Sequence, residues 1–341
     1  MLLLRELQLP TIDLLEALAP PANRPDTWPL DKHIAYFLQQ TVNGVTVGSI
    51  YALIAFGYTM VYGITGIINF AFGELYMMGA FAAVIVFLLL AGGGIGLPAM
   101  LVLVLIASMT LTPAYGWIAS RILYRPMYGA TRLSPLIAAI GLSIALQEYV
   151  RLLQGTHVVF LPPMVHQGRT LFEGNGFTFQ MSTGQLLVIG TAGLLMLALW
   201  LLIARTRFGR AQRACAQDRV MAEMVGIDVG RTVAATFMLG AALAAAAGTI
   251  VALCYGGVEP YMGYLVGFKA LTAALLGGIG SLSGAWIGGL LIGLFETYWA
   301  GYLDTLYRDV AVFALLVMVL TLRPDGISGQ GGETRLVNER I

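Results

Sequence analysis

The sequence has few charged residues. Asp, Glu, Lys and Arg make up 11% of its 341 residues, whereas a soluble domain typically contains about 25%. Hydrophobic residues make up 58%. This shortage of charge excludes an ordinary soluble protein and indicates that most of the chain lies in a lipid bilayer.

Lysine, cysteine and histidine are also scarce. The two lysines, Lys32 and Lys269, do not stand in the glycine pattern of a phosphate-binding P-loop, so the sequence predicts no ATP binding by that motif. We expect Cys215 and Cys254 to lie near opposite ends of one span, too far apart for a disulfide. The isolated histidines form no metal cluster, and no Ser-His-Asp or Cys-His set is recognisable. We therefore predict neither an enzyme nor a cofactor, metal or nucleic-acid binding protein.

Apolar segments of about 20 residues recur along the chain. They are continuously apolar, which favours helices over the alternating strands of a β-barrel. The segments are 45–62, 67–91, 98–122, 133–153, 186–204, 232–255, 268–282, 285–303 and 306–322. The segment 268–282 is short and rich in glycine, so it is a candidate half-helix. The prediction is an all-α polytopic membrane protein, a bundle of eight or nine transmembrane helices.

Arginine is concentrated in three connections: 121–132, 205–231 and the region after 322. By the positive-inside rule these regions are cytoplasmic, and the loop 154–185 lies outside. Nine helices would place the amino terminus outside, and eight would place it inside.

We divide the chain into an N-terminal extension and linker, a transmembrane domain and a cytoplasmic tail. Their bounds are 1–41, 42–323 and 324–341, with the cytoplasmic segment 205–231 inside the second. The extension lacks the long apolar region of a signal peptide, and its residues 2–18 can form an amphipathic helix on the membrane surface.

Glycine interrupts two of the apolar regions, 57–66 and 277–284. Each follows an Ala-Leu-x-Ala sequence, at 52–55 and 270–273, and each is followed by an acid and a tyrosine. Two weakly similar halves with interrupted helices are typical of transporters. The alternative is that glycine only allows close helix packing.

A few ionisable residues lie inside or at the edge of the apolar regions. A charge at membrane depth costs at least about 2.5 kcal/mol, so each is expected to face protein or a water-filled path. Glu148 is expected to pair with Arg151 at the end of its span. The candidates for a translocation pathway are Asn69, Glu74, Lys269 and Glu296. The alternative for these residues is structural contact between helices.

The segment between Arg205 and Arg231 carries six arginines and three acids. Residues 210–225 can form a short, alanine-rich helix that ends at Gly226 as a C-cap. Such a helix can lie in a groove of a partner protein and transmit its motion to the adjacent spans. The alternative is a basic loop that only fixes topology. The candidate coupling residues are Gly209, Arg210, Arg213, Ala214, Ala222 and Gly226.

Several motifs between residues 37 and 329 carry a family resemblance. They are Asn43-Gly44-Val45, the segments 51–55 and 57–64, Ile68-Asn69-Phe70-Ala71, Tyr124-Arg125-Pro126, Gly209-Arg210, Arg213-Ala214-Cys215-Ala216, Leu276-Gly277-Gly278-Ile279-Gly280-Ser281 and Pro324-Asp325-Gly326-Ile327. Together they resemble the H-type permease subunit of branched-chain amino acid ABC importers.

The resemblance implies a multi-pass subunit of the bacterial inner membrane that imports branched-chain, hydrophobic amino acids. It implies three kinds of protein partner besides lipid and substrate: two cytoplasmic ABC ATPases, which hydrolyse ATP, a second related permease and a periplasmic substrate-binding protein. Residues 210–228 match the segment that docks on the ATPase. Relatives that import urea or short amides leave the substrate open, and a stand-alone secondary carrier or a channel remains an alternative.

Overall fold

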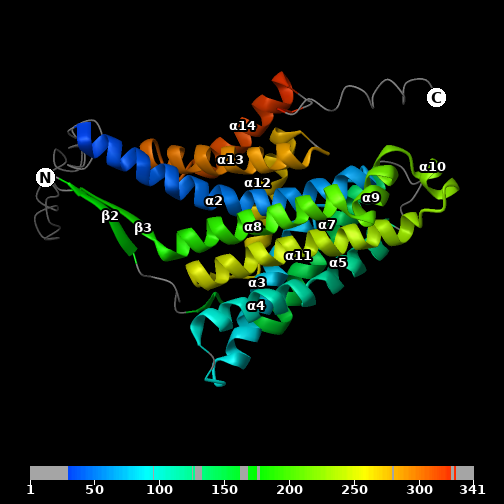
Figure 1. Cartoon of the computed structure of the whole chain (residues 1–341), viewed down its shortest axis with the longest axis horizontal. Helices are drawn as coiled ribbons and strands as arrows, with labels where there is room; N and C mark the ends of the chain where they lie inside the picture. The colour runs from blue at the N-terminus through cyan, green and yellow to red at the C-terminus, as the bar shows by residue number, and fades with distance from the viewer. Residues whose placement is uncertain are drawn as a thin grey trace, which may run out of the picture.

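The computed structural model of the chain describes residues 30–94, 96–124, 126, 133–161, 168–174, 177–278, 280–323 and 326–327. These residues form a bundle of α-helices with two small two-stranded sheets (Figure 1). Six of the helices are long and apolar enough to cross a membrane. The chain is therefore a helical multi-pass membrane protein, as predicted, although the number of spans stays a prediction. The amphipathic helix expected at 2–18 and the tail from 328 lie outside the described residues.

Most helices follow one another with short connections, whereas the connection from α7 to α8 spans residues 155–182. They are α2 (Leu30–Thr65), α3 (Phe72–Leu90), α4 (Leu97–Leu111), α5 (Pro113–Ala119), α7 (Leu133–Gln154), α8 (Thr183–Arg205), α9 (Arg207–Gln217), α10 (Arg219–Met224), α11 (Val229–Tyr255), α12 (Met262–Gly277), α13 (Leu282–Tyr302) and α14 (Arg308–Leu322). A π-helical turn, η2 (Ser120–Tyr124), continues α5. Pro98 and Pro113 stand in the first turns of α4 and α5, where a missing backbone donor costs nothing.

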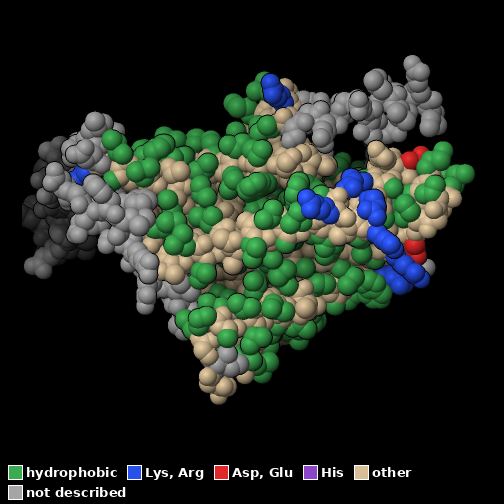
Figure 2. Space-filling view, viewed as in Figure 1, with side chains coloured by type: hydrophobic (Ala, Val, Ile, Leu, Met, Phe, Trp, Pro, Cys, Tyr) green, Lys and Arg blue, Asp and Glu red, His purple; other side chains and the backbone are tan. Residues whose placement is uncertain are grey.

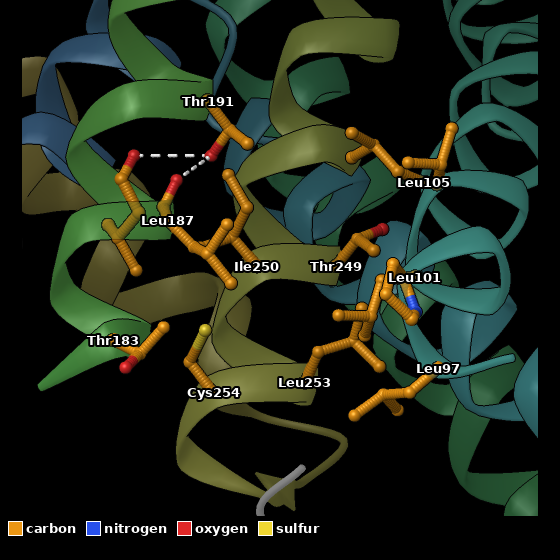
Figure 3. A pocket seen from close by; sticks show the side chains of 13 residues that line it. Leu97, Leu101, Leu105, Thr183, Leu187, Thr191, Thr249, Ile250, Leu253 and Cys254 are labelled. Atoms are coloured by element: carbon orange, nitrogen blue, oxygen red, sulfur yellow. Dashed lines mark hydrogen bonds between the residues drawn. The ribbon is translucent and has the colours of Figure 1, made fainter. Parts of the chain in front are cut away.

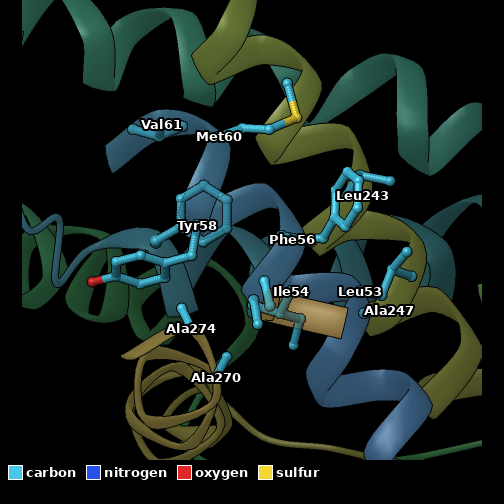
Figure 4. Close-up of a cluster of buried hydrophobic side chains, with 14 of the residues drawn as sticks. Leu53, Ile54, Phe56, Tyr58, Met60, Val61, Leu243, Ala247, Ala270 and Ala274 are labelled. Atoms are coloured by element: carbon cyan, nitrogen blue, oxygen red, sulfur yellow. The ribbon is translucent and has the colours of Figure 1, made fainter. Parts of the chain in front are cut away.

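The core lies where α2, α3, α11 and α12 meet. The most apolar 18 residues of α2, α3 and α11 are 89%, 67% and 72% buried, against 28% or less in α4–α5, α7 and α8. Figure 4 shows Leu53 and Phe56 of α2 in a cluster with Leu243 of α11 and Ala274 of α12. The peripheral helices turn large apolar side chains outward, as lipid-facing helices do.

Glycine brings the backbones of the central helices into contact. Helices α2 and α13 run antiparallel, with Gly48 against Leu290 and Gly44 against Leu294. A methyl group added at Gly48 would lie 2.9 Å from the Leu290 Cα, closer than packed atoms tolerate. Glycine at a helix interface is typical of membrane bundles, where helices associate by close packing. Close packing therefore accounts for these glycines.

Two non-helical segments interrupt the bundle, one beginning at the last residue of the glycine region predicted at 57–66 and the other inside the region predicted at 277–284. Residues 66–71 separate α2 from α3, and residues 278–281 separate α12 from α13. Gly278 and Gly280 have φ values of 97° and 93°, a conformation that side-chain-bearing residues avoid. Helix α2 itself continues through Gly57 and Gly63, so the first break begins only at Gly66. Non-helical backbone at membrane depth requires protein or water around it, and both breaks adjoin the core.

The two ends of the bundle differ in structure and charge. An antiparallel hairpin of β2 (Gly168–Gly174) and β3 (Phe177–Ser182) precedes α8, and β1 (Val159–Phe160) pairs with β4 (Gly257–Val258). The hairpin lies at the end opposite α9 and α10 (Figure 1). Most basic side chains visible in Figure 2 gather at the α9–α10 end. The loop 154–185 was predicted to lie outside the membrane, but the two strands of the hairpin within it were not predicted.

Candidate functional site

The four predicted pathway residues are all buried and lie in two groups. Asn69 and Glu74 stand at the beginning of α3, whereas Lys269 and Glu296 face each other from α12 and α13. Helix α12 contacts both groups, because a methyl group at Gly263 would lie 2.6 Å from the Glu74 Oε2.

Lys269 is the centre of a buried ionic cluster. Its Nζ lies 2.7 Å from Glu296 Oε1 and 2.6 Å from Asp309 Oδ1. Arg308 Nε is 3.7 Å from each of the same carboxylates, and the Tyr51 hydroxyl donates to Glu296 Oε2 at 2.8 Å. Two cations therefore balance two anions where α2, α12, α13 and α14 meet. Pairing of this kind offsets the cost of burying a charge.

Sequence reasoning found two members of this cluster and missed the others. Arg308 and Asp309 begin α14, after a short connection from α13, so they resemble ordinary polar residues at the end of a span. A signal was available in the spacing, because antiparallel helices joined by a short loop bring the last turn of one beside the first turn of the next.

Glu74 occupies a different environment. Its side chain is fully buried, and its Oε1 accepts hydrogen bonds from Ser143 Oγ at 2.9 Å and Gln147 Nε2 at 2.7 Å. Both donors belong to α7, the least buried of the six long helices. Glu74 Oε2 has no hydrogen-bond partner within the described part of the chain. The carboxyl group thus fastens a peripheral helix to the core and retains an unused acceptor.

Asn69 shapes the break that precedes α3. Its Oδ1 accepts from the Ala71 backbone N–H at 3.0 Å, and its main-chain oxygen accepts from the Tyr58 hydroxyl at 2.6 Å. The Asn69 Nδ2 is buried without a partner among the residues that the structure describes.

The segment between α8 and α11 consists of two helices rather than the single helix predicted at 210–225. Helix α9 begins at Arg207, with Thr206 Oγ1 accepting from Gly209 N–H. It ends at Asp218, whose carboxylate accepts from Met221 N–H at 3.1 Å and starts α10. The prediction was wrong because an aspartate with extended backbone is a strong N-cap and breaks the alanine-rich pattern. Gly226 has a φ of 85° just after α10, which agrees with the predicted C-cap.

The predicted coupling residues face both inward and outward. Gly209 packs against the Ile203 backbone, Arg213 donates to the Ile203 carbonyl at 2.6 Å, and Ala222 is buried. Ala214 is half-buried, and Arg210 is exposed. Four apolar side chains that were not singled out as coupling residues are 60–75% exposed and form what we call the α10 surface: Val220, Met221, Met224 and Val225.

Arg219 connects α10 to the end of α2. Its Nε and Nη2 donate to the Ile64 carbonyl at 3.1 and 2.6 Å. Ile64 stands in the last turn of α2, two residues before the break at 66–71. The α9–α10 segment is therefore bound directly to the first interrupted helix.

Two cavities line the flanks of the bundle. One, of about 490 Å³, lies between α4, α8 and α11 and is almost wholly apolar, with Leu101, Leu187 and Leu253 in its walls (Figure 3). A second, of about 300 Å³, lies between α2, α8, α9 and the residues 280–283 at the start of α13. Thr59 Oγ1 and Gln212 Oε1 belong to residues that line this second cavity, and both atoms are buried without a partner in the described residues.

Smaller expectations are also confirmed. Glu148 forms an ion pair with Arg151 one turn away, and Cys215 and Cys254 are both free.

The fold and these contacts define a multi-pass helical membrane protein in which non-helical segments interrupt the bundle and the short helices α9 and α10 connect α8 to α11. Residues 40–322 match the family model described as the permease component of branched-chain amino acid transport systems, so the chain belongs to that family.

Curated relatives match over nearly their whole length. The high-affinity branched-chain amino acid transport system permease protein LivH of Escherichia coli K12 is 46% identical over 88% of this chain and 98% of its own. The corresponding protein BraD of Pseudomonas aeruginosa is 47% identical over 87% and 97%. A weaker match, 32% over 30% of this chain, is the fructose import permease protein FrcC of Rhizobium meliloti. No solved structure matches the chain.

Proposed function

We propose that this chain is the membrane-spanning permease subunit of an ATP-binding-cassette importer that moves branched-chain amino acids across the bacterial inner membrane. The observation that carries the proposal is the match at 46–47% identity, over almost the full length, to permeases named for that transport. The chain lacks a P-loop motif, so ATP hydrolysis is assigned to separate subunits. A second permease and a periplasmic binding protein complete the proposed assembly.

The α10 surface is the proposed contact with the ATPase. Four apolar side chains, each at least 60% exposed, stand next to arginines outside the long apolar helices. Methionine-rich, exposed surfaces of this kind favour docking into a groove of a partner. The charged end of the bundle, which the positive-inside rule places in the cytoplasm, is where an ATPase would be found.

Arg219 is the proposed connection between docking and transport. Because its guanidinium holds the Ile64 carbonyl, a movement of α10 pulls on the last turn of α2. The adjacent break contains Asn69 and leads to Glu74, and both carry a buried polar atom without a partner in the described chain. This supports a pathway role for the first break, whereas the pairing of Lys269 and Glu296 supports a structural role at their mutual contact.

Reconstitution tests the proposal. The chain, its partner permease, the two ATPases and the binding protein are placed in liposomes, and uptake of labelled leucine is measured with unlabelled urea as competitor. We expect ATP-dependent uptake of leucine that urea does not reduce. Uptake by this chain alone, without ATPases, would contradict the proposal and favour a secondary carrier or a channel.

A pair of variants tests the α10 surface in the same system. Met224→Asp places a charge in the proposed contact, whereas Gln217→Asp places one on an exposed polar position of α9. We expect the first variant to assemble poorly with the ATPase and to lose most transport, and the second to behave like the wild type. Equal transport by both variants would argue against docking through α10.

A further inference from the structure

A third cavity, of about 430 Å³, opens at the end of the bundle opposite α9 and α10. It lies between the first half of α2, the start of α8, the ends of α11 and α13, and the start of α14. Its polar lining includes Gln40, Asn43, Gln185, Glu296, Thr297 and Arg308. A pocket of this size is within the range of small-molecule sites. Its lining also combines an acidic residue, Glu296, with a basic one, Arg308, and neither of the other two cavities has both.

Arg308 has binding capacity that the protein does not use. Its closest approach to Glu296 and to Asp309 is 3.7 Å from Nε, longer than a hydrogen bond. Within the described residues no hydrogen bond from its guanidinium is found, and its side chain is 46% exposed. Lys269, by contrast, is held at 2.6 and 2.7 Å by two carboxylates. Lys269 therefore holds the two carboxylates together, whereas Arg308 lines the cavity with N–H donors that make no hydrogen bond within the described residues.

Glu296 is the fixed negative group of the same cavity. Tyr51 and Lys269 each occupy one of its carboxylate oxygens, which holds the group in one orientation. A carboxylate has about four acceptor positions, so these two contacts leave capacity for a further donor. A preorganised carboxylate of this kind suits an ammonium group.

The remaining walls are suited to an apolar side chain. Val47 and Ala300 line the cavity together with the rings of Tyr36 and Tyr255. The Tyr36 hydroxyl is bonded to the Gly301 carbonyl at 2.8 Å, so its ring is held in place. A cavity that combines opposite charges with small and aromatic groups matches the three parts of an apolar amino acid.

We propose that this cavity is a binding subsite for an amino-acid zwitterion within the permease itself. Arg308 binds the α-carboxylate through its planar donor fork, Glu296 binds the α-ammonium group, and Val47 and Ala300 contact the side chain. This inference rests on the proposed amino-acid transport and adds the site that recognises the substrate after its delivery. Urea has neither charged group and gains nothing from Arg308 and Glu296.

Direct binding to the whole complex tests the subsite. The complex is purified in nanodiscs without the binding protein, and the affinities of L-leucine and of leucinamide, which lacks the carboxylate, are measured by calorimetry. The variants are Arg308→Gln, Arg308→Lys and the cavity-filling Ala300→Leu. Arg151→Gln is the matched control, because Arg151 pairs with Glu148 on α7 and does not line the cavity.

We expect the wild type and Arg151→Gln to bind leucine at least tenfold more tightly than leucinamide. Arg308→Gln removes that preference by weakening leucine alone, Arg308→Lys restores part of it, and Ala300→Leu weakens both ligands. An unchanged preference in Arg308→Gln overturns the proposal. A wild-type complex that imports leucine but binds none without the binding protein also overturns the subsite while leaving the transport function intact. A complex that imports no leucine at all refutes the function itself.

Discussion

Replacement of Lys269 by methionine tests the ionic cluster most directly. Methionine has an apolar side chain of nearly the same length as lysine. The substitution therefore removes only the ammonium charge, which lies within 2.7 Å of both Glu296 and Asp309. At an effective dielectric constant of about 20, each contact contributes roughly 6 kcal/mol of Coulomb attraction, much of which offsets desolvation. Because the variant leaves the buried Glu296 carboxylate and the half-buried Asp309 carboxylate with one loosely placed arginine, we expect a net loss of about 3–5 kcal/mol of stability.

The measurement is thermal unfolding of the purified protein in detergent, monitored by the loss of the near-ultraviolet circular dichroism that reports tertiary structure. A loss of this size should lower the midpoint on the order of 5–10 °C. Lys32→Met is the control, because it removes the only other lysine of the chain. Adding Glu296→Gln to Lys269→Met should recover about 1–3 kcal/mol, since the two residues are coupled. A Lys269→Met variant that melts with the Lys32→Met control would refute the electrostatic account.

Three further predictions concern other parts of the chain. Arg219→Ala removes two hydrogen bonds to Ile64, and we expect it to lower transport severalfold while ATP hydrolysis by the complex continues, measured in parallel in proteoliposomes. Gly248→Leu pushes a side chain into the α3 backbone at Tyr76 and should destabilise the protein by more than about 2 kcal/mol in the same melting assay. Burial raises the pKa of the Cys215 thiol, so its thiolate fraction at pH 8 lies below that of an exposed cysteine, and maleimide should label it more slowly.

The long apolar helices were predictable because lipid imposes a strong pattern on the sequence. Segments 133–153 and 232–255 correspond closely to α7 and α11, since a span must be continuously apolar and of nearly fixed length. The second glycine break was also predictable as a position, because glycine is the residue that allows the φ values of Gly278 and Gly280. The first was predicted too early in the chain, since α2 stays helical through Gly57 and Gly63.

Contacts between helices were not predictable from local patterns. Glu74 and Glu296 looked equivalent in sequence, yet one is bonded to neutral donors of α7 and the other to a lysine of α12. Which partner an acid meets depends on the packing order of the helices, and that order leaves no periodic signal. The same limit applies to the α10 surface, because the turn at Asp218, which a single predicted helix did not contain, decides which side chains point outward.

The seam between α2 and α13 has a consequence for how such a protein can move. Along it, Gly44, Gly48, Gly289 and Gly293 bring the two backbones into contact, and the same interface also holds the hydrogen bond from Tyr51 to Glu296. Backbones in direct contact leave no space for a second packed arrangement, so we expect the two helices to move as a single rigid body. A conformational cycle must therefore bend the chain elsewhere, and the segments 66–71 and 278–281, which both adjoin the same end of this antiparallel pair, are its natural hinges.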